Sequence, residues 1–194
     1  VCQPLLAALG YIMNLIHRAV AEKDIPVICS WAKNQDELFY FFPKATYPLT
    51  PEQLSGAIAQ RANSTVVELE GQPVAFANFY KWENGGTCSI GNVIVSSEAR
   101  DQGVAMFLMQ QMCAIAFHEH NASEVTVSCF NFNTAGLLLY PKLGFRPFAT
   151  EERQAKAGNR VALIHMRLSG LQPNKRFKSF ASLSGTGRAG PLTK

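Results

Sequence analysis

The chain has 194 residues, of which 47% are hydrophobic and 16% are charged, and it carries a formal net charge of +4. This length and composition predict one domain with a full hydrophobic core, which excludes a disordered protein and a small disulfide-rich protein. The five cysteines are odd in number and include no C-x-x-C pair, so we expect neither a disulfide framework nor a structural zinc site, and we expect a cytoplasmic location.

The first residues, VCQPLLAALGYI, are apolar but have neither the length of a membrane span nor the basic start of a signal peptide. We therefore interpret residues 1–13 as a leader outside the folded domain and expect no membrane association. Together with PNKRFKS near the other end, VCQPL resembles read-through of the recombination sites that flank mobile gene cassettes.

The folded domain is predicted to begin with a strand and three short helices. Residues 14–20 alternate apolar and polar side chains, which is typical of a strand. Asp24 and Thr50 are suitable N-caps, and the aromatic segment DELFYFF ends at a proline. These features predict helices over residues 24–33, 36–42 and 51–59.

Three consecutive antiparallel strands are expected next. Turns that contain glycine separate three segments rich in β-branched and aromatic residues. The predicted strands cover residues 65–69, 74–82 and 88–95.

The second half of the domain alternates helices and strands. Residues 104–120 carry apolar side chains at helical spacing, and Gly144 is a suitable C-cap for a helix over residues 133–143. The order of elements predicts an α+β (α/β) domain around a single mixed sheet that spans residues 14–169. Further strands are expected over residues 124–129, 145–149 and 161–168, with a turn over residues 156–159.

The positive charge is concentrated at the end of the chain. Residues 171–194 contain five basic residues and no acidic one, which leaves 13 basic against 14 acidic residues in the rest of the chain. The segment is rich in Gly and Ser and lacks apolar periodicity, so we interpret residues 170–194 as a flexible basic tail. A nucleic-acid partner would depend on this tail alone and is not expected.

Several well-known functional motifs are absent from the sequence. It contains no G-x-G-x-x-G, no G-x-x-x-x-G-K-[ST] and no G-x-S-x-G, which argues against dinucleotide binding, a P-loop and a serine hydrolase. The four histidines show no metal-binding spacing, so no metal is expected. We interpret His118 and His120 as a solvated pair near the end of a helix.

The segment from Val93 to Ala105 predicts a strand, a short loop and the start of a helix. The small residues Gly103 and Ala105 leave backbone N–H groups uncovered at the positive end of the helix, where a pyrophosphate can bind. Taken alone, the same pattern is also typical of an ordinary connection between a strand and a helix.

Two motifs in this region resemble those of the GNAT N-acetyltransferase superfamily, whose members use acetyl-CoA. Arg100-x-x-Gly103-x-Ala105 resembles the [Q/R]-x-x-G-x-[G/A] loop of the family. The segment from Asn133 to Phe145 resembles its second motif, N-x-x-A-x-x-L-Y-x-K-x-G-F, except that Gly136 replaces the usual Ala. The resemblance implies the GNAT fold, with a mixed, mostly antiparallel sheet of six or seven strands, flanked by helices and splayed between strands 4 and 5.

The resemblance also implies roles for individual residues. Backbone amides after Arg100 would hold the pyrophosphate of acetyl-CoA, and the strand before the loop would pair with the pantetheine arm. Tyr140 would donate a proton to the departing CoA thiolate, because a phenol is protonated at neutral pH. The residues assigned to acetyl-CoA in this way are Val93, Ile94, Val95, Arg100, Gln102, Gly103, Val104, Ala105, Met106, Asn133, Gly136 and Tyr140.

The resemblance does not identify a general base. Many relatives have Glu early in the fourth strand, but the matching position here is near Ser89. We assign Glu83, acting through water, as the base, and a neutral incoming amine is the alternative. Cys88 is a poor candidate for a nucleophile, so we expect direct attack of the amine in a ternary complex.

The acceptor is expected to be a primary amine of a small molecule or a peptide. Aromatic residues are concentrated between residues 31 and 47, and some are expected to line the acceptor pocket. The few local carboxylates, Asp36 and Glu37, weaken the case for a polycationic aminoglycoside. The residues assigned to the acceptor are Trp31, Phe41, Tyr47 and Asn92.

Two further possibilities are left open by the sequence. A GNAT-fold sensor or interaction module that binds acyl-CoA without turnover is the alternative function, because no competent base is evident. A homodimer is one assembly that the sequence allows.

Overall fold

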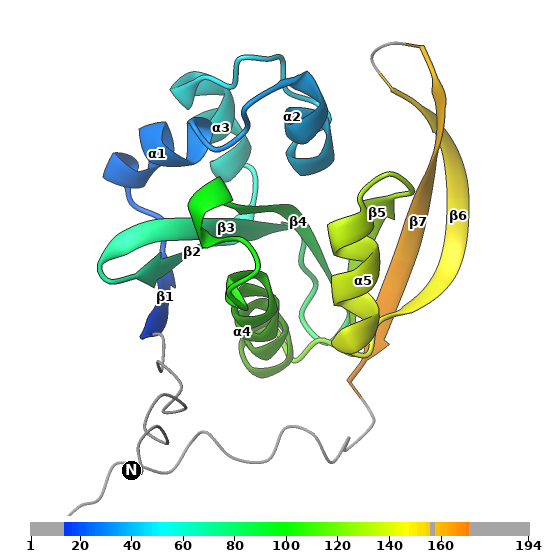
Figure 1. Ribbon diagram of the computed structural model, residues 1–194. Coiled ribbons are helices and arrows are strands. Elements are labelled where there is room, and N and C mark those ends of the chain that lie inside the picture. Colours follow the sequence, from blue (N-terminus) through cyan, green and yellow to red (C-terminus); the bar gives the residue numbers. More distant parts are fainter. Residues whose placement is uncertain (1–13, 156–157, 171–194) are drawn as a thin grey trace, which may run out of the picture.

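A computed structural model describes residues 14–155 and 158–170. They contain a seven-stranded sheet in which only β4 and β5 are parallel (Figure 1). This arrangement confirms the predicted mixed, mostly antiparallel sheet. In spatial order the strands are β1 (Leu15–Ala19), β2 (Ala62–Leu69), β3 (Gln72–Lys81), β4 (Thr87–Val95), β5 (Glu124–Phe130), β7 (Arg160–Ser169) and β6 (Arg146–Gln154).

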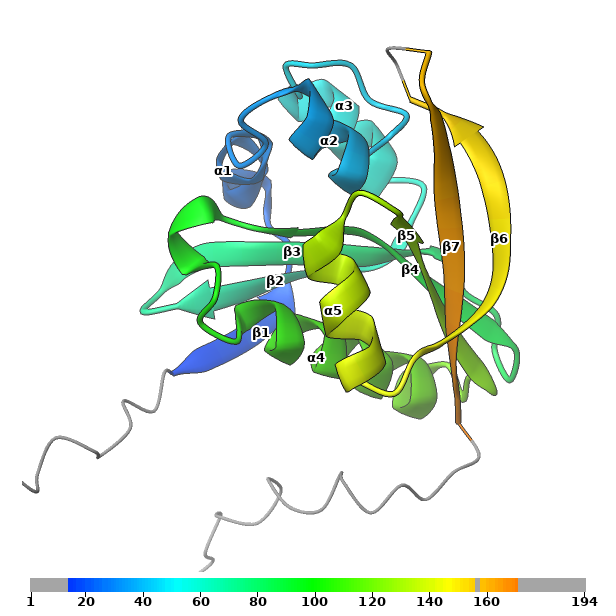
Figure 2. The ribbon, with the colours of Figure 1, turned by 45° about the vertical axis from the view of Figure 1, so that its right-hand side comes forward.

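Helices cover both faces of the sheet (Figures 1 and 2). One face carries α1 (Ile25–Cys29), α2 (Gln35–Phe41) and α3 (Pro51–Ile58), and the other carries α4 (Val104–Glu119) and α5 (Thr134–Lys142). Short 3-10 helices, η1 (Glu22–Asp24) and η2 (Ser97–Ala99), precede α1 and follow β4.

The alternation of side chains along the strands builds two separate cores. In β3, Ala77 and Phe79 pack toward α4, whereas Phe76 packs toward α1, α2 and α3. Successive side chains of a strand point to opposite faces, so one strand contributes to both cores. The sheet is therefore held between two apolar layers, and α4 and α5 are fixed against the face opposite α2.

The parallel strands β4 and β5 separate part of the way along their length. Thr87 to Ile90 of β4 pair with Glu124 to Val127 of β5, and no pairing follows beyond Val127. Near this point β4 contains a bulge, because two residues between Gly91 and Ile94 oppose one residue of β3. Asn92 has a positive φ of 51° in the bulge, which increases the local twist. This separation confirms the predicted splay between strands 4 and 5.

Several predicted boundaries differ from those in the structure. The first helix covers only Ile25–Cys29, with Ser30 as its C-cap, and the side chain of Asp24 does not cap its start. Asn34 caps α2, and its Oδ1 accepts a hydrogen bond from the Glu37 N–H at 2.9 Å. Only His118 of the predicted histidine pair is exposed, since His120 Nε2 lies 2.7 Å from Asn63 Oδ1. The predicted leader over residues 1–13, residues 171–194 of the tail and part of the 156–159 turn lie outside the described residues.

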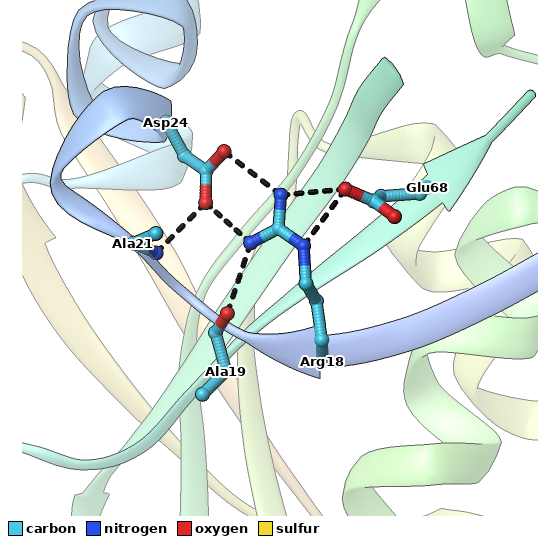
Figure 3. A network of polar contacts seen from close by, with 5 residues as sticks. All are labelled: Arg18, Ala19, Ala21, Asp24 and Glu68. Atoms are coloured by element: carbon cyan, nitrogen blue, oxygen red, sulfur yellow. Dashed lines mark hydrogen bonds and ion pairs between the residues drawn. The ribbon is translucent and has the colours of Figure 1, made fainter. Parts of the chain in front are cut away.

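Asp24 instead belongs to a charged cluster that is centred on Arg18 and joins β1, η1 and β2 (Figure 3). Arg18 donates hydrogen bonds to both oxygens of Asp24, at 2.5 and 2.9 Å, and to Glu68 Oε1 at 2.7 Å. Asp24 is only 1% exposed and also accepts the Ala21 N–H at 2.8 Å. The hydrogen bonds from Arg18 lower the pKa of Asp24, although burial acts in the opposite direction.

Arg18→Met should reduce the free energy of unfolding by about 3 kcal/mol at pH 7, because it leaves a buried carboxylate without its partner. The low pKa of Asp24 stabilises the wild type above about pH 3.9, and this contribution is lost as the pH falls through the lowered pKa. In the variant the largest influence that lowers the pKa of Asp24 is gone, so this pKa should rise and acidification should relieve the destabilisation. Urea unfolding should show a smaller difference in the free energy of unfolding between the wild type and Arg18→Met at pH 3.5 than at pH 7.

The control is Arg160→Met. The Arg160 and Glu152 side chains form an ion pair while 78% and 56% exposed, so this change should alter stability by less than about 0.5 kcal/mol. An equal effect of both substitutions would contradict a structural role for the Arg18 cluster.

Candidate active site

A cavity of about 790 Å³ lies where β4 and β5 separate. Its wall is formed by the end of β4, the loop that follows, the first turn of α4, the start of α5 and part of α2. This volume is in the range of small-molecule sites. The members of the predicted acetyl-CoA set that line it are Val93, Ile94, Val95, Arg100, Gly103, Val104, Ala105, Met106, Asn133, Gly136 and Tyr140.

The first turn of α4 presents free backbone N–H groups to the cavity. The first four N–H groups of an α-helix have no acceptor within the helix, and Gly103 at the N-cap has no side chain that could satisfy them. Gly103 has a φ of +79°, and a Cβ built there would meet no atom within 4 Å. The positive end of a 16-residue helix is thus open to an anion.

Two polar side chains hold the loop before α4. Arg100 lines the cavity and lies 3.3 Å from Glu37 Oε1 of α2. Gln102 does not line the cavity, because its Nε2 turns away and donates to the Glu98 carbonyl at 2.8 Å. Any contribution of Gln102 to ligand binding would therefore come from its backbone.

Among the residues that the structure describes, no strand lies next to the edge of β4 beside the cavity. Ile94 and Val95 pair with β3 on one side, but on the other side the pairing with β5 has already ended at Ile90. An unpaired strand edge offers backbone donors and acceptors to an extended ligand that carries amides.

Tyr140 lies on the wall formed by α5. Asn133 fixes the start of this helix, since its Oδ1 accepts the Gly136 N–H at 3.0 Å. Tyr140 is 4% exposed, and within residues 14–155 and 158–170 nothing forms a hydrogen bond with its hydroxyl. Burial raises the pKa of Tyr140, so the phenol is protonated at neutral pH.

Gly136 departs from the motif for a steric reason. A Cβ at this position would lie 2.8 Å from Cys129 Sγ, which is too close for two unbonded atoms. The same Cβ would be 3.1 Å from the ring of Tyr140. The buried Cys129 thus occupies the space that an alanine methyl group would need.

The structure does not bring Glu83 to the cavity. Glu83 is exposed, and its side chain lies over Gly86 in the turn before β4. Thr87 lies six positions before Val93 along the strand, about 20 Å at 3.3 Å per residue. Glu83 therefore lies outside the cavity wall, and the structure gives no support to its assignment as the base.

The predicted acceptor residues are also dispersed. Phe41 lines the cavity, but Trp31 is 5% exposed within the core beneath α1 and α3. Tyr47 points elsewhere and donates to the Lys33 carbonyl at 2.9 Å. Asn92 is buried behind the wall, where its Nδ2 donates to the Phe41 carbonyl at 3.0 Å.

Glu37 and Tyr40 also line the cavity, although neither is among the four residues assigned to the acceptor. Both belong to α2, the same aromatic helix as Phe41. Their place in that helix was the sequence signal that could have added them to the assigned set. The sequence prediction also missed polar side chains of the central strands, among them Ser128 and His165, which form a hydrogen bond of 2.9 Å. Polar residues at alternate positions of a buried strand were the pattern that could have revealed them.

Neither a membrane span nor a metal cluster is found in the described part of the chain. No helix there is long and apolar enough to cross a bilayer. No group of three or more His, Cys, Asp or Glu side chains there could hold a metal ion.

A family model described as "Acetyltransferase (GNAT) family" matches residues 28–145. The fold is similar to that of spermidine N-acetyltransferase from Vibrio cholerae in complex with CoA and spermine, with a TM-score of 0.69 and 15% identity over 80% of this chain and 95% of that one. It is also similar to ribosomal-protein-alanine N-acetyltransferase from Brucella melitensis, with a TM-score of 0.65 and 19% identity over 79% and 99% of the two chains. An N-acetyltransferase from Staphylococcus aureus Mu50 matches with a TM-score of 0.64 and 20% identity over 80% and 98%.

Gly136→Ala should lower the free energy of unfolding by about 2 kcal/mol, because the new methyl group overlaps Cys129 Sγ. In a Cys129→Ala background the same change should be nearly neutral, since the sulfur is gone and Ala favours a helix over Gly by about 1 kcal/mol. A double-mutant cycle by urea unfolding measures this coupling.

Gly56→Ala is the matched control. Gly56 lies in α3, and a Cβ there would meet no atom within 4 Å, so this change should stabilise by about 1 kcal/mol. Additive effects of the substitutions at positions 129 and 136 would contradict the steric explanation.

Proposed function

Because the chain belongs to the GNAT family of acetyltransferases, we propose that it transfers the acetyl group of acetyl-CoA to a primary amine of a small molecule or a peptide. The observation that carries the proposal is the cavity where β4 and β5 separate. It combines an open helix N-terminus, an unpaired strand edge and a buried, protonated tyrosine.

The shape and polarity of the cavity fit acetyl-CoA. The free N–H groups of Val104, Ala105 and Met106 would bind the pyrophosphate, with Arg100 beside them. The edge of β4 from Val93 to Val95 would pair with the amides of the pantetheine arm, as an added strand does. When bound, acetyl-CoA supplies a thioester whose acyl carbon is open to attack by an amine.

Tyr140 is proposed as the general acid. Its hydroxyl carries a proton at neutral pH and has no hydrogen-bond partner in the described part of the chain, so it is available to a thiolate. Proton donation to the leaving sulfur removes the negative charge that would otherwise develop in a buried site.

Direct attack by the amine fits the state of the cysteines. Burial raises the pKa of Cys29 and Cys129 to about 11 and that of Cys113 to about 12, and it also raises the pKa of Cys88. A thiol in this state is a poor nucleophile at neutral pH, because the reactive form is the thiolate. An acetyl-cysteine intermediate on these four residues is therefore not proposed.

The acceptor is proposed to be a small amine or a peptide amino terminus. The charged residues of the cavity wall are balanced, with Glu37 and Asp101 opposed by Arg100 and Lys142. Such a wall lacks the acidic excess that a polycationic aminoglycoside would need. Tyr40 and Phe41 add aromatic surface beside Glu37.

Tyr140→Phe should lower kcat by about 100-fold, because it removes the proton donor, while leaving the Kd for CoA unchanged. Thiol release from acetyl-CoA would be followed with benzylamine, spermidine and a peptide that begins with alanine. Tyr80→Phe, at an exposed tyrosine outside the cavity wall, is the control and should retain full activity. Tight CoA binding without thiol release from any of the three amines would favour the acyl-CoA-binding module instead.

Gly103→Ala should weaken CoA binding by about 10-fold, because a methyl group would stand over the N–H groups that bind the pyrophosphate. Gly71→Ala is the control, since Gly71 has nearly the same φ, +78° against +79°, and equally open surroundings. Both changes should lower stability by a similar amount, about 1–2 kcal/mol. Isothermal titration with CoA separates the two effects, and equal affinities of the two variants would refute the assigned pyrophosphate site.

A further inference from the structure

Amine acetylation needs a proton acceptor, because the nitrogen loses a proton as its bond to the acyl carbon forms. Two carboxylates line the cavity, Glu37 and Asp101. Glu37 accepts the Lys33 N–H at 2.8 Å and pairs with Arg100, and Asp101 lies in the loop before α4, on the side of the proposed pyrophosphate site. Glu83 does not line the cavity, which leaves room for a proton acceptor from another part of the fold.

The two faces of β5 differ in their surroundings at the point where β4 departs. Cys129 faces α5, because its sulfur lies beside Gly136. Phe130 faces α2, where its ring stacks on Phe39 with centroids 4.5 Å apart. By alternation, Ser128 lies on the same face of the sheet as Phe130, one residue beyond the last parallel pair, Ile90 and Val127.

Ser128 is the first member of a polar chain that crosses to β6. It lies opposite His165 of β7, and Ser128 Oγ is 2.9 Å from His165 Nδ1. On the other side of the ring, His165 Nε2 is 3.5 Å from Glu151 Oε1. The His165 side chain is 27% exposed, so the chain of groups is sheltered but in contact with solvent. Its three residues do not line the cavity, and Ser128 is the member next to the point where β4 and β5 separate.

The charges around His165 come from β5, β6 and β7. Arg153 also binds Glu151, with its Nε 2.8 Å from Oε1. Arg167 lies two residues from His165 and is directed to Glu124 at 3.7 Å and to the ring of Phe148. Both arginines are thus held by other groups, and neither approaches His165 as a hydrogen-bond partner.

We propose that Ser128 and His165 form the relay that removes the proton from the acceptor amine, with Glu151 as a positioning residue. This inference rests on the proposed acetyltransferase function. As the N–C bond forms and the C–S bond breaks, the amine proton passes to Ser128 Oγ, and the hydroxyl proton of Ser128 passes to His165 Nδ1. Tyr140 protonates the CoA thiolate, and solvent then returns the proton of His165 to the Tyr140 phenolate.

The arrangement suits each step of this transfer. Glu151 favours the tautomer with its proton on Nε2, which leaves Nδ1 as the acceptor for the Ser128 hydroxyl. The carboxylate also stabilises the imidazolium that forms. Base and acid act from opposite faces of β5, so the amine and the thiolate need not share one proton-transfer group.

The test compares kcat against pH, at saturating acetyl-CoA, for the wild type, His165→Gln, Ser128→Ala, Ser128→Thr and Glu151→Gln. The probe is whichever of benzylamine, spermidine and the alanine peptide the wild type acetylates fastest. His165→Gln and Ser128→Ala should lower kcat by about 100-fold without changing CoA affinity. We expect the wild-type kcat to fall at acidic pH, because a protonated imidazole cannot accept a proton. His165→Gln should lack this fall.

Two variants separate chemistry from folding. Ser128→Thr keeps the hydroxyl and should stay within a few-fold of the wild type, and Glu151→Gln should reduce kcat by about 10-fold. The matched control is His118→Gln, at an exposed histidine of α4, which should leave both kcat and its pH profile unchanged.

The outcomes distinguish the relay from the underlying function. If the wild type acetylates an amine and Tyr140→Phe impairs it, but His165→Gln keeps the rate and the acidic limb, the relay alone is refuted. An acetyl group trapped on Ser128 and located by peptide mass spectrometry would also refute the relay, because Ser128 would then be a nucleophile. If none of the three amines is acetylated by the wild type, the proposed function fails and the relay fails with it.

Discussion

The site depends on one constraint, the early separation of two parallel strands in the middle of the sheet. Parallel strands covered by helices on both faces normally pair along their length, because buried backbone groups need partners. Here the pairing ends at Ile90 and Val127, and the bulge at Asn92 directs β4 away. The backbone left unpaired must be satisfied from outside the fold. An extended ligand that carries amides can do this, which makes the sheet itself part of the binding site.

The pleat of β5 divides the proposed chemistry between two compartments. Cys129 faces the compartment of α5, where burial keeps Tyr140 protonated. Ser128, its neighbour in the chain, faces the compartment of α2 and meets His165. Adjacent residues of β5 thus face the proposed proton donor, Tyr140, on one side of the sheet and the proposed proton acceptor, His165, on the other. The separation needs no intervening domain, because the sheet is itself the barrier between the two faces.

Features encoded within short segments could be predicted from the sequence, whereas features that depend on long-range pairing could not. The loop around Gly103 and the segment from Asn133 to Tyr140 are local, so their place in the order of elements could be predicted from the sequence, whereas their proposed roles came from the resemblance to the GNAT family. Glu83 lies just before β4, whereas the cavity lies at the other end of this strand, and the sequence alone does not show at which end of a strand a site will form. Trp31 and Phe41 are both buried aromatic residues, and only tertiary packing decides that Phe41 lines the cavity while Trp31 does not. Ser128 and His165 lie 37 residues apart, and only the register between β5 and β7 joins them.

The contact between Cys129 and the position of Gly136 constrains how the sequence can change over time. A glycine that replaces a common alanine is an obvious target for back-to-consensus engineering, which rests on family frequencies. Because the sulfur of Cys129 lies 2.8 Å from the missing Cβ, the consensus residue is unsuitable while the cysteine remains. The two positions form an epistatic pair, so residue 129 has to become smaller before residue 136 can become larger. Residue frequencies considered one sequence position at a time would miss this order of substitutions, because Cys129 lies on β5 and Gly136 lies on α5.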